Sequence, residues 1–521
     1  MKMFGPAGII IWLQLADFAC AAAPNPQLNI LFILADDAGW SDLGCYGSTF
    51  YETPHLDRLA SQGMKFTDAY AACPVCSPTR AALMTGRYPP RVGITNFIGG
   101  NRAGKLQPAA YLDYLPLDEI TIAEAFQDAG YTTGIFGKWH LGGGGSSPAR
   151  QGFDVVECGG GGGGFNGVDR ADRVTDAALR FLDVHKDKPF FLYLPHNLVH
   201  VPLLAKPELE AKYQRKAELL TSSKVKRFRP QGGQHDRRVQ EHATYAAMME
   251  DLDTNIGRVL ARLDELKLSD RTIVIFTSDN GGLSTAEGSP TSNAPLRAGK
   301  GWLYEGGIRE PLIVRWPGVI KAGSVCATPV ITNDFYPTLL EACGLSAMLE
   351  QHVDGASIAP LFKGGRLPNR PLFWHYPHYS NQGGGPAGAV RLGDWKLIEF
   401  YEDQRAELYN LRADVGENRD LAANRPDKVR ELRAQLANWR QAVGAKMPST
   451  LPDSTADPPT RRAQPRGGHQ QSSIAKERLR SDTPARRHAM PEENRLRLAT
   501  DDPPHRSKKS LSNTARQRAA D

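Results

Sequence analysis

Two cysteines stand three residues apart in the segment CPVCSPTR, which runs from Cys73 to Arg80 and is followed by AALMTGR. A C-x-x-C pair can form a disulfide, bind zinc or supply a reactive thiolate. The sequence has no second C-x-x-C and no nearby histidine pair at zinc-finger spacing, which disfavours zinc. A disulfide between Cys73 and Cys76 and a cysteine used for chemistry both remain open at this point.

Two oxygen-rich pairs each follow an apolar segment. Asp36 and Asp37 come directly after NILFILA, and Asp279 and Asn280 come after TIVIFTS. Hard cations such as calcium bind carboxylate and amide oxygens at about 2.3–2.6 Å. One such pair alone would be interpreted as a helix N-cap. Two pairs at the ends of two strands favour a metal site instead.

Alternating strands and helices must position these residues. The apolar segments predicted as strands are Asn29–Ala35, 132–138, 189–194, 272–277 and 311–315. The segments predicted as helices are 51–63, 120–130 and 244–268. This alternation predicts an α/β fold with a large, mostly parallel sheet flanked by helices. Ligands of such sheets bind at the carboxyl ends of the strands, where the polar pairs lie.

The pattern changes from about residue 384. GAVRLGDWKLIEFY and RAELYNL are typical of antiparallel strands, and 426–443 reads as an amphipathic helix. The sequence therefore predicts a signal peptide at 1–23, a catalytic α/β domain at 24–383, a smaller C-terminal subdomain at 384–444 and a basic disordered tail at 445–521.

The first residues have the features of a secretory signal. Lys2 precedes a short apolar run at 8–16, and small residues at 19–23 offer a cleavage site. Asp17 stands where a lipoprotein signal needs an aliphatic residue, so simple export to the periplasm or the medium is favoured over lipidation at Cys20. No later stretch is apolar for long enough to cross a membrane. The pairing of the other cysteines, Cys45, Cys73, Cys158, Cys326 and Cys343, stays open.

The net charge of +6 belongs to the end of the chain. Residues 445–521 hold 16 Lys and Arg and 9 Asp and Glu, which leaves 47 basic and 48 acidic residues in the rest. This tail is rich in Pro, Arg, Ser and Gln and has little periodic apolar pattern, which predicts disorder. Because the rest of the chain is nearly neutral, nucleic-acid binding is disfavoured.

Several blocks resemble a known family when taken together. CSPTR at 76–80 with LMTG at 83–86 is similar to the sulfatase signature, C-x-P-[ST]-R followed by two apolar residues and T-G. Four further blocks resemble that family and occur in its order: DD at 36–37, GKWH at 137–140, HVP at 200–202, and GK at 299–300 with EGGIREP at 305–311. By this resemblance the chain is identified as a type I, formylglycine-dependent, arylsulfatase-like sulfatase with an alkaline-phosphatase-like fold.

The resemblance implies a role for Cys76 that answers the opening question. In this family a separate formylglycine-generating enzyme oxidises that cysteine to Cα-formylglycine. The hydrated aldehyde attacks sulfur with one oxygen, and the sulfated diol then eliminates sulfate. The family pattern also implies a Ca²⁺ ion bound by Asp36, Asp37, Asp279, Asn280 and the modified Cys76.

Charged and titratable residues would complete the site by the same resemblance. Arg80 and His140 are expected to hold the diol, with His140 as the base for elimination. Lys138 and Lys300 are expected to bind sulfate oxygens. His200 is expected to protonate the leaving alcohol, and His196 is the alternative for this role.

The expected substrate is a sulfated carbohydrate or an aryl sulfate. A phosphonate or phosphate ester hydrolase of the same superfamily is the alternative, and a non-catalytic exported binding protein is disfavoured because no block is missing. The aromatic and polar segment around Trp374, His375, Tyr376, His378 and Tyr379 could stack on a sugar or pack the join to the subdomain, and packing is favoured.

Overall fold

Strand β1 (Asn29–Ala35) lies inside a nine-stranded sheet between β9 and β6. All seven of its residues are buried, which explains why its sequence is apolar without alternation. The strands in order across the sheet are β11 (Ser324–Cys326), β2 (Met64–Tyr70), β10 (Arg309–Arg315), β9 (Thr272–Ser278), β1, β6 (Phe190–Pro195), β4 (Thr132–Phe136) and β5 (Val155–Glu157), with β12 (Val330–Ile331) beside β2.

Most neighbouring strands of this sheet run parallel, and β10 is antiparallel to both β2 and β9. β1 and β9 pair in register from Asn29↔Thr272 to Ala35↔Ser278, so their carboxyl ends coincide. The prediction of a large, mostly parallel α/β sheet is therefore confirmed.

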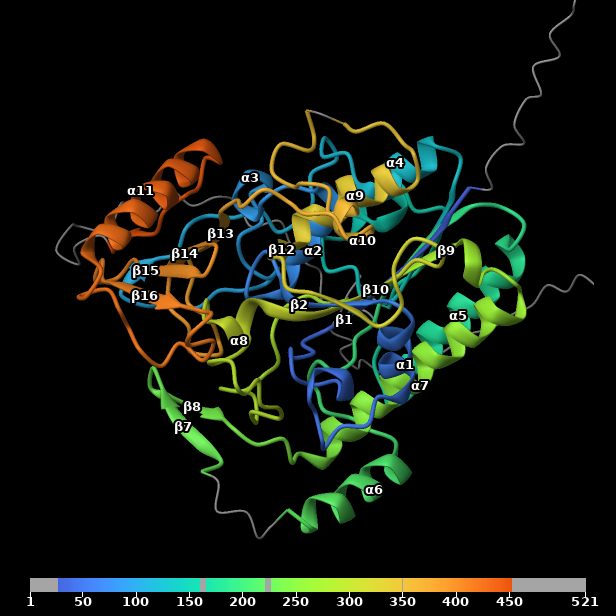
Figure 1. Cartoon of the computed structure of the whole chain (residues 1–521), viewed down its shortest axis with the longest axis horizontal. Coiled ribbons are helices and arrows are strands. Elements are labelled where there is room, and N and C mark those ends of the chain that lie inside the picture. Colours follow the sequence, from blue (N-terminus) through green and yellow to red (C-terminus); the bar gives the residue numbers. More distant parts are fainter. Residues whose placement is uncertain (1–26, 160–164, 221–225, 349, 452–521) are drawn as a thin grey trace, which may run out of the picture. The chain divides into compact units, whose positions relative to one another are not determined.

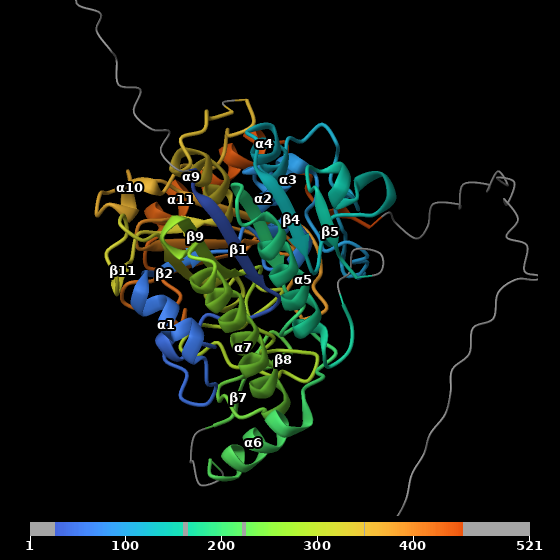
Figure 2. The ribbon, with the colours of Figure 1, turned by 90° about the vertical axis from the view of Figure 1, so that its right-hand side faces the viewer.

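Helices cover both faces of the sheet (Figure 1). One set packs on the face that holds Leu31 and Ile33: α1 (Pro54–Gln62), α5 (Arg170–His185) and α7 (Ala243–Glu265). The other set packs on the face that holds Ile30 and Phe32: α2 (Cys76–Thr85), α4 (Ile122–Asp128), α9 (Phe335–Ala342) and α10 (Ala359–Phe362). Figure 2 shows α5 and α7 lying side by side on their face. Alternate residues of β1 thus belong to two separate cores.

A second, antiparallel sheet lies near the end of the described chain. Its strands in order are β13 (Leu372–Tyr376), β14 (Ala387–Leu392), β15 (Trp395–Phe400) and β16 (Ala406–Asn410). Helix α11 (Pro426–Ala442) packs on this sheet through Leu432 and Leu436. The predicted smaller antiparallel sheet is confirmed. Its first strand is β13, and the domain boundaries given above stay predictions.

Trp374, His375 and Tyr376 belong to β13 and are buried, as is His378. Trp374 and Tyr376 belong to the cluster that joins the small sheet to Tyr70, the last residue of β2, and to Ala72. The favoured interpretation of this segment as packing therefore agrees with its position.

Short elements complete the described chain. They are α3 (Pro89–Val92), α6 (Pro207–Glu218), α8 (Glu305–Ile308), the pair β3 (Leu106–Gln107) with β17 (Ser449–Thr450), the hairpin β7 (Phe228–Gln231) with β8 (Gln234–Arg237), and the 3₁₀ turns η1 (Gly44–Tyr46), η2 (Gly144–Ser146), η3 (Pro148–Arg150), η5 (Ser269–Arg271) and η6 (Thr332–Asp334).

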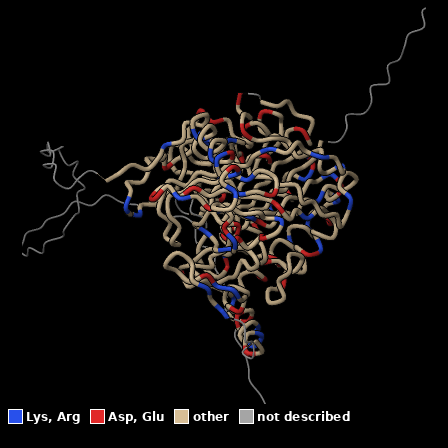
Figure 3. The backbone as a smooth tube through the Cα atoms, turned by 60° about the vertical axis from the view of Figure 1, so that its left-hand side comes forward, with Lys and Arg blue, Asp and Glu red and all other residues tan. Residues whose placement is uncertain are grey.

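This computed structural model describes residues 27–159, 165–220, 226–348 and 350–451. These residues belong to one unit, Met1–Asp453. The predicted signal peptide and residues 452–521 of the predicted tail lie outside the described residues. Among the described helices, none combines the length and the apolar character needed to span a bilayer. Basic and acidic residues are interspersed along the described backbone (Figure 3).

The first prediction concerns the end of the chain. Truncation after Leu451 is expected to leave the melting temperature unchanged, because the following sequence has too little apolar surface to offset its ordering entropy. Truncation after Gly444 is expected to lower it by roughly 1–2 °C, because it removes β17 and the Lys446 carbonyl that accepts a hydrogen bond from His375 Nε2 at 3.0 Å. Calorimetry of both truncated proteins beside the full chain measures this. A drop of several degrees on truncation after Leu451 would show that residues 452–521 stabilise the body.

Candidate active site

Carboxylate and amide groups from two adjacent strands meet at the carboxyl edge of the sheet. Asp36 and Asp37 follow β1, Asp279 and Asn280 follow β9, and all four are fully buried. Asn280 Nδ2 donates to Asp37 Oδ1 at 2.7 Å, and the Asp37 backbone N–H donates to Asp279 Oδ1 at 3.2 Å. The structure thus brings together the two pairs that the sequence placed at strand ends.

Three buried cations balance these carboxylates. Arg80 donates through Nε and Nη2 to Asp279 Oδ2 at 2.8 and 2.6 Å, and through Nη1 to the Lys138 carbonyl at 2.8 Å. Lys138 Nζ lies 2.7 Å from Asp36 Oδ2, and Lys300 Nζ lies 2.7 Å from Asp37 Oδ1. Burial alone would raise the pKa of Asp36, but the charges of Lys138, His200, Arg80 and Lys300 together outweigh it and hold that pKa well below its usual range.

Gly137 lets Lys138 approach the neighbouring strand. Its φ of 127° and the 2.0 Å that would separate a Cβ from the Pro195 carbonyl oxygen leave room for glycine alone. The Lys138 backbone N–H then donates to the same carbonyl at 2.7 Å. The end of β4 is thereby held against the end of β6, and Lys138 lies beside Asp36.

Cys76 is the first residue of α2 and is 2% exposed. Burial acts to raise the pKa of its thiol, yet the charges of Lys138 and Lys300 and hydrogen bonds with His140 and His200 bring it well below its usual value. A helix N-terminus favours negative charge in the same way. Cys73 and Cys76 are both free thiols in the structure, so the disulfide considered above does not form here.

The two histidines after β6 differ in their surroundings. His196 is fully buried, and neither of its ring nitrogens finds a hydrogen-bond partner among the described residues. His200 has a side chain 27% exposed, with Nε2 3.7 Å from Asp37 Oδ2 and Nδ1 2.7 Å from the Val201 carbonyl. Burial and Lys300 act to lower the pKa of His200, but Asp37 and Asp36 outweigh them and raise it to about 9. His200, rather than His196, reaches the open part of the site.

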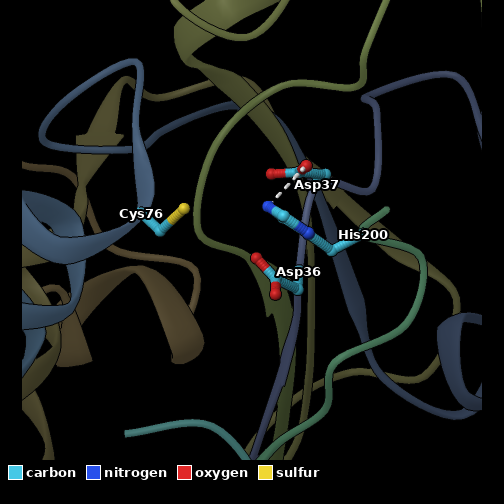
Figure 4. Close-up of side chains that lie close together, drawn as sticks. All are labelled: Asp36, Asp37, Cys76 and His200. Carbon is cyan, nitrogen blue, oxygen red and sulfur yellow. Dashed lines mark ion pairs between the residues drawn. The ribbon is translucent and has the colours of Figure 1, made fainter. Parts of the chain in front are cut away.

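A cavity of about 450 Å³ opens above these groups. Its floor holds Asp36, Cys76, Lys138, His140, Arg170, His200 and Lys300. Figure 4 shows the side chains of Asp36, Asp37, Cys76 and His200 directed toward one another. The predicted residues Arg80, Asp37, Asp279 and Asn280 lie behind this floor rather than among the lining residues.

The buried oxygens fit a divalent cation. Asp36, Asp37, Cys76 and His200 offer ligand atoms that all lie within 4.8 Å of one another. Asp36 Oδ1, which lies 3.6 Å from Arg80 Nη2, and Asn280 Oδ1 are buried and accept no hydrogen bond from any described residue. Buried oxygens without a hydrogen bond are costly unless something binds them. Asp279, also predicted as a ligand, has Oδ2 bonded to Arg80, so the complete ligand set stays a prediction.

Other residues of the cavity were not predicted from the sequence. Arg170 is 3% exposed and donates to the carbonyls of His200 and Pro202 at 3.1 and 3.2 Å. The outer lining consists of Phe97, Ile98, Phe165, Asn166, Asn197, Val201, Pro202, Glu287, Asn381 and Gln382. Most come from loops distant in the sequence with no recognisable spacing, and only the HVP block at 200–202 pointed to any of them.

Comparisons with known proteins agree with this geometry. The Sulfatase family matches residues 28–345, and the family described as N-sulphoglucosamine sulphohydrolase, C-terminal, matches residues 298–442. A sulfatase of Formosa agariphila is 34% identical, covering 83% of this chain and 92% of the relative. The N-acetylgalactosamine-6-sulfatase of Canis lupus familiaris is 35% identical over 74% of each chain. The crystal structure of Ps i-CgsB has a TM-score of 0.65 and 30% identity, covering 79% of this chain and 92% of that one.

The fold and the matched families define a hydrolase of the alkaline-phosphatase superfamily. Within that superfamily the chain belongs to the type I sulfatase family and is an enzyme that hydrolyses sulfate esters. This excludes the non-catalytic binding protein considered above. It also favours sulfate esters over phosphate and phosphonate esters.

The second prediction concerns Arg80, whose guanidinium is fully buried against Asp279. Arg80→Ala is expected to lower the free energy of unfolding by about 3–5 kcal/mol, because it leaves a buried carboxylate without its partner. Urea denaturation of the purified protein measures this. Arg262→Ala, at an ion pair with Asp183 on the surface of α7, is the matched control and should leave the free energy of unfolding nearly unchanged, because solvent screens that pair. Equal losses in the two variants would contradict the importance assigned to the buried pair.

Proposed function

We propose that this sulfatase releases inorganic sulfate from a sulfated carbohydrate or an aryl sulfate, with Cys76 as the precursor of its nucleophile. The observation that carries the proposal is the convergence of Cys76, Lys138, His200 and Lys300 on one cavity. Positive groups fixed around a small space are what a sulfate ester needs, because negative charge grows on the leaving oxygen during the reaction.

Cys76 is proposed to be converted to Cα-formylglycine by a formylglycine-generating enzyme. The hydrated aldehyde would supply an oxygen nucleophile and, after transfer, a route for expelling sulfate by elimination. The CSPTR block and the family membership support this assignment. His140 is proposed to accept the proton of the diol hydroxyl in the elimination. It forms a hydrogen bond with residue 76, and burial lowers its pKa.

The cation is proposed to be Ca²⁺, held by Asp36, Asp37, Asp279, Asn280 and residue 76. The donor set consists mainly of hard carboxylate and amide oxygens, which suit calcium. When bound, the ion would supply positive charge for the sulfate oxygens and for the nucleophile. Arg80 donates hydrogen bonds to Asp279 and to the Lys138 backbone and so holds both in place for that site. Arg80 lies one turn after residue 76 in α2 and is proposed to hold the formylglycine diol together with His140.

Lys138 and Lys300 are proposed to bind the sulfate oxygens, because both ammonium groups lie at the floor of the cavity. His200 is proposed to protonate the leaving alcohol through Nε2. Its Nδ1 lies 2.7 Å from the Val201 carbonyl, which fixes the ring orientation and leaves Nε2 toward the site.

Similarity to sulfatases named for sugar substrates supports a carbohydrate substrate, and the arylsulfatase A of Homo sapiens, 33% identical, supports the aryl sulfate in the same way. The relative from Canis lupus familiaris is an N-acetylgalactosamine-6-sulfatase. Ps i-CgsB has been solved in complex with k-i-k-neocarrahexaose, and that structure is 29% identical to this chain with a TM-score of 0.65. Export with cleavage of a signal peptide at 1–23 is proposed from the sequence pattern alone.

The third prediction tests the nucleophile. When the protein is made together with a modifying enzyme, mass spectrometry of the tryptic peptide 66–80 is expected to show a mass about 18 units below that of the peptide with unmodified cysteine, because the CH₂SH side chain is oxidised to CHO with loss of sulfur. Cys76→Ala and Cys76→Ser should lose nearly all turnover, since neither side chain can expel sulfate by elimination. Cys73→Ala, which alters the neighbouring thiol in the same peptide, is the control and should keep turnover. Active protein that carries only the unmodified thiol at Cys76 would contradict the mechanism.

The fourth prediction tests the metal. Asp37→Ala is expected to lower the bound calcium of the purified protein at least tenfold, because the site loses a buried anionic ligand. Elemental analysis of the variant and of the unchanged protein after the same dialysis measures this. Asp403→Ala, which removes a carboxylate exposed beside Arg405, serves as the matched control. Full calcium content in Asp37→Ala would remove Asp37 from the ligand set.

A further inference from the structure

The outer part of the cavity carries one acidic side chain that the mechanism does not use. Among the residues that line the cavity, the carboxylates are Asp36 and Glu287. Asp36 belongs to the proposed metal site. Glu287 is exposed to the opening and forms no ion pair with any described Lys or Arg side chain. A surface carboxylate beside a sulfate-binding floor repels anions. Its presence there therefore indicates a contact with another part of the substrate.

Gln382 holds Glu287 in one orientation. Gln382 Nε2 donates to Glu287 Oε1 at 2.6 Å, and Gln382 Oε1 accepts from Ser380 Oγ at 2.6 Å. The Gln382 carbonyl also accepts from Trp302 Nε1 at 2.9 Å. Because Gln382 Oε1 accepts the hydrogen bond from the Ser380 hydroxyl, the NH₂ group of the same amide is the end that faces Glu287. The other carboxylate oxygen, Glu287 Oε2, accepts no hydrogen bond from the described residues and is available to a ligand in the cavity.

Contacts through Gln382 and Ser380 connect Glu287 with the backbone at the sulfate end of the cavity. Gly301 follows Lys300 directly and has a φ of 82°, and a Cβ there would lie 1.9 Å from Ser380 Oγ. The backbone beside Lys300 therefore packs directly on the residues that hold Gln382. Glu287 itself has a φ of 54°, which non-glycine residues adopt where surrounding contacts hold them. Glu287 and Lys300 are thus linked through Gln382, Ser380 and Gly301.

We propose that Glu287 is a specificity-determining residue that accepts a hydrogen bond from a hydroxyl or N–H group of the sugar ring that carries the sulfate. The substrate class is then a monosulfated sugar with an unsulfated donor near its ester. A second sulfate at that place is excluded, because it offers acceptors alone and its charge is repelled. Phe97 and Phe165 give the cavity apolar walls for the faces of such a ring. This inference rests on the proposed function.

Glu287→Gln gives a sharp test, because Gln382 would orient the new amide. Gln382 Nε2 donates to the oxygen at this position, so the amide NH₂ of the variant would face the cavity and replace an acceptor with a donor. The probes are monosulfated galactose, monosulfated N-acetylgalactosamine, their deoxy analogues lacking one hydroxyl at a time, and disulfated galactose. The measurement is kcat/KM for sulfate release by the modified, metal-loaded enzyme.

In the unchanged enzyme, loss of one particular hydroxyl, or replacement of the N-acetylamino group by hydroxyl, is expected to lower kcat/KM about tenfold or more. In Glu287→Gln, loss of the same substrate group should lower kcat/KM by about twofold or less. The ratio of kcat/KM for the disulfated sugar to kcat/KM for the monosulfated sugar should rise at least tenfold. Gln382→Ala should reduce the same dependence, since Glu287 then loses its orienting donor. Glu265→Gln, an equal change of charge at the end of α7, is the control and should leave both ratios unchanged.

The outcomes separate this inference from the proposed function. Sulfate release in which Glu287→Gln changes every substrate by the same factor would overturn the role of Glu287 while leaving the enzyme a sulfatase. Preference of the unchanged enzyme for the disulfated sugar would do the same. No sulfate release from any sugar or from 4-nitrophenyl sulfate would overturn the proposed function, and this inference with it.

Discussion

Three carboxylates buried at the carboxyl ends of β1 and β9 determine what must surround them. Asp36, Asp37 and Asp279 are fully buried, and an uncompensated carboxylate at such a depth costs several kcal/mol. Arg80 comes from α2, Lys138 follows β4, and Lys300 comes from the loop before α8. Because each cation belongs to a different segment, the charges are balanced only when the sheet, α2 and that loop have come together. The ion pairs between these carboxylates and their cations therefore form only in the complete fold.

The small sheet contributes to the same arrangement through a second buried ionic group. Lys396 of β15 is fully buried and pairs with Glu305 at 2.8 Å and Glu417 at 2.9 Å. Glu305 begins α8, five residues after Lys300, and also pairs with Arg309 of β10 at 3.3 Å. The loop that carries Lys300 is therefore fixed to both sheets. The C-terminal part of the chain supports the catalytic floor, although it supplies none of the predicted catalytic residues.

The sequence indicated elements whose pattern is local and missed those that depend on distant neighbours. β1 and α11 were predicted to within a residue because a continuous apolar run and a 3.6-residue period identify them directly. β2, MKFTDAY, was missed because its polar residues face other buried groups, as Asp68 does with Arg309. The site followed the same rule. Apart from Arg170, the floor lies in blocks that resemble a family, whereas Glu287 and Gln382 meet only through the fold.

Chemistry and selectivity consequently depend on different parts of the structure. The floor is made by residues that follow buried strands, begin helices or lie on the loop before α8, and loss of one buried charge there leaves its partner uncompensated. Glu287 and Gln382 lie on loops, and their contacts with Trp302 and Ser380 hold them without passing through the carboxylates of the floor. A substitution at the opening can therefore change which sugar is accepted without disturbing the charge balance beneath it. A scaffold of this kind can keep one reaction while its loops adapt to different sulfated substrates.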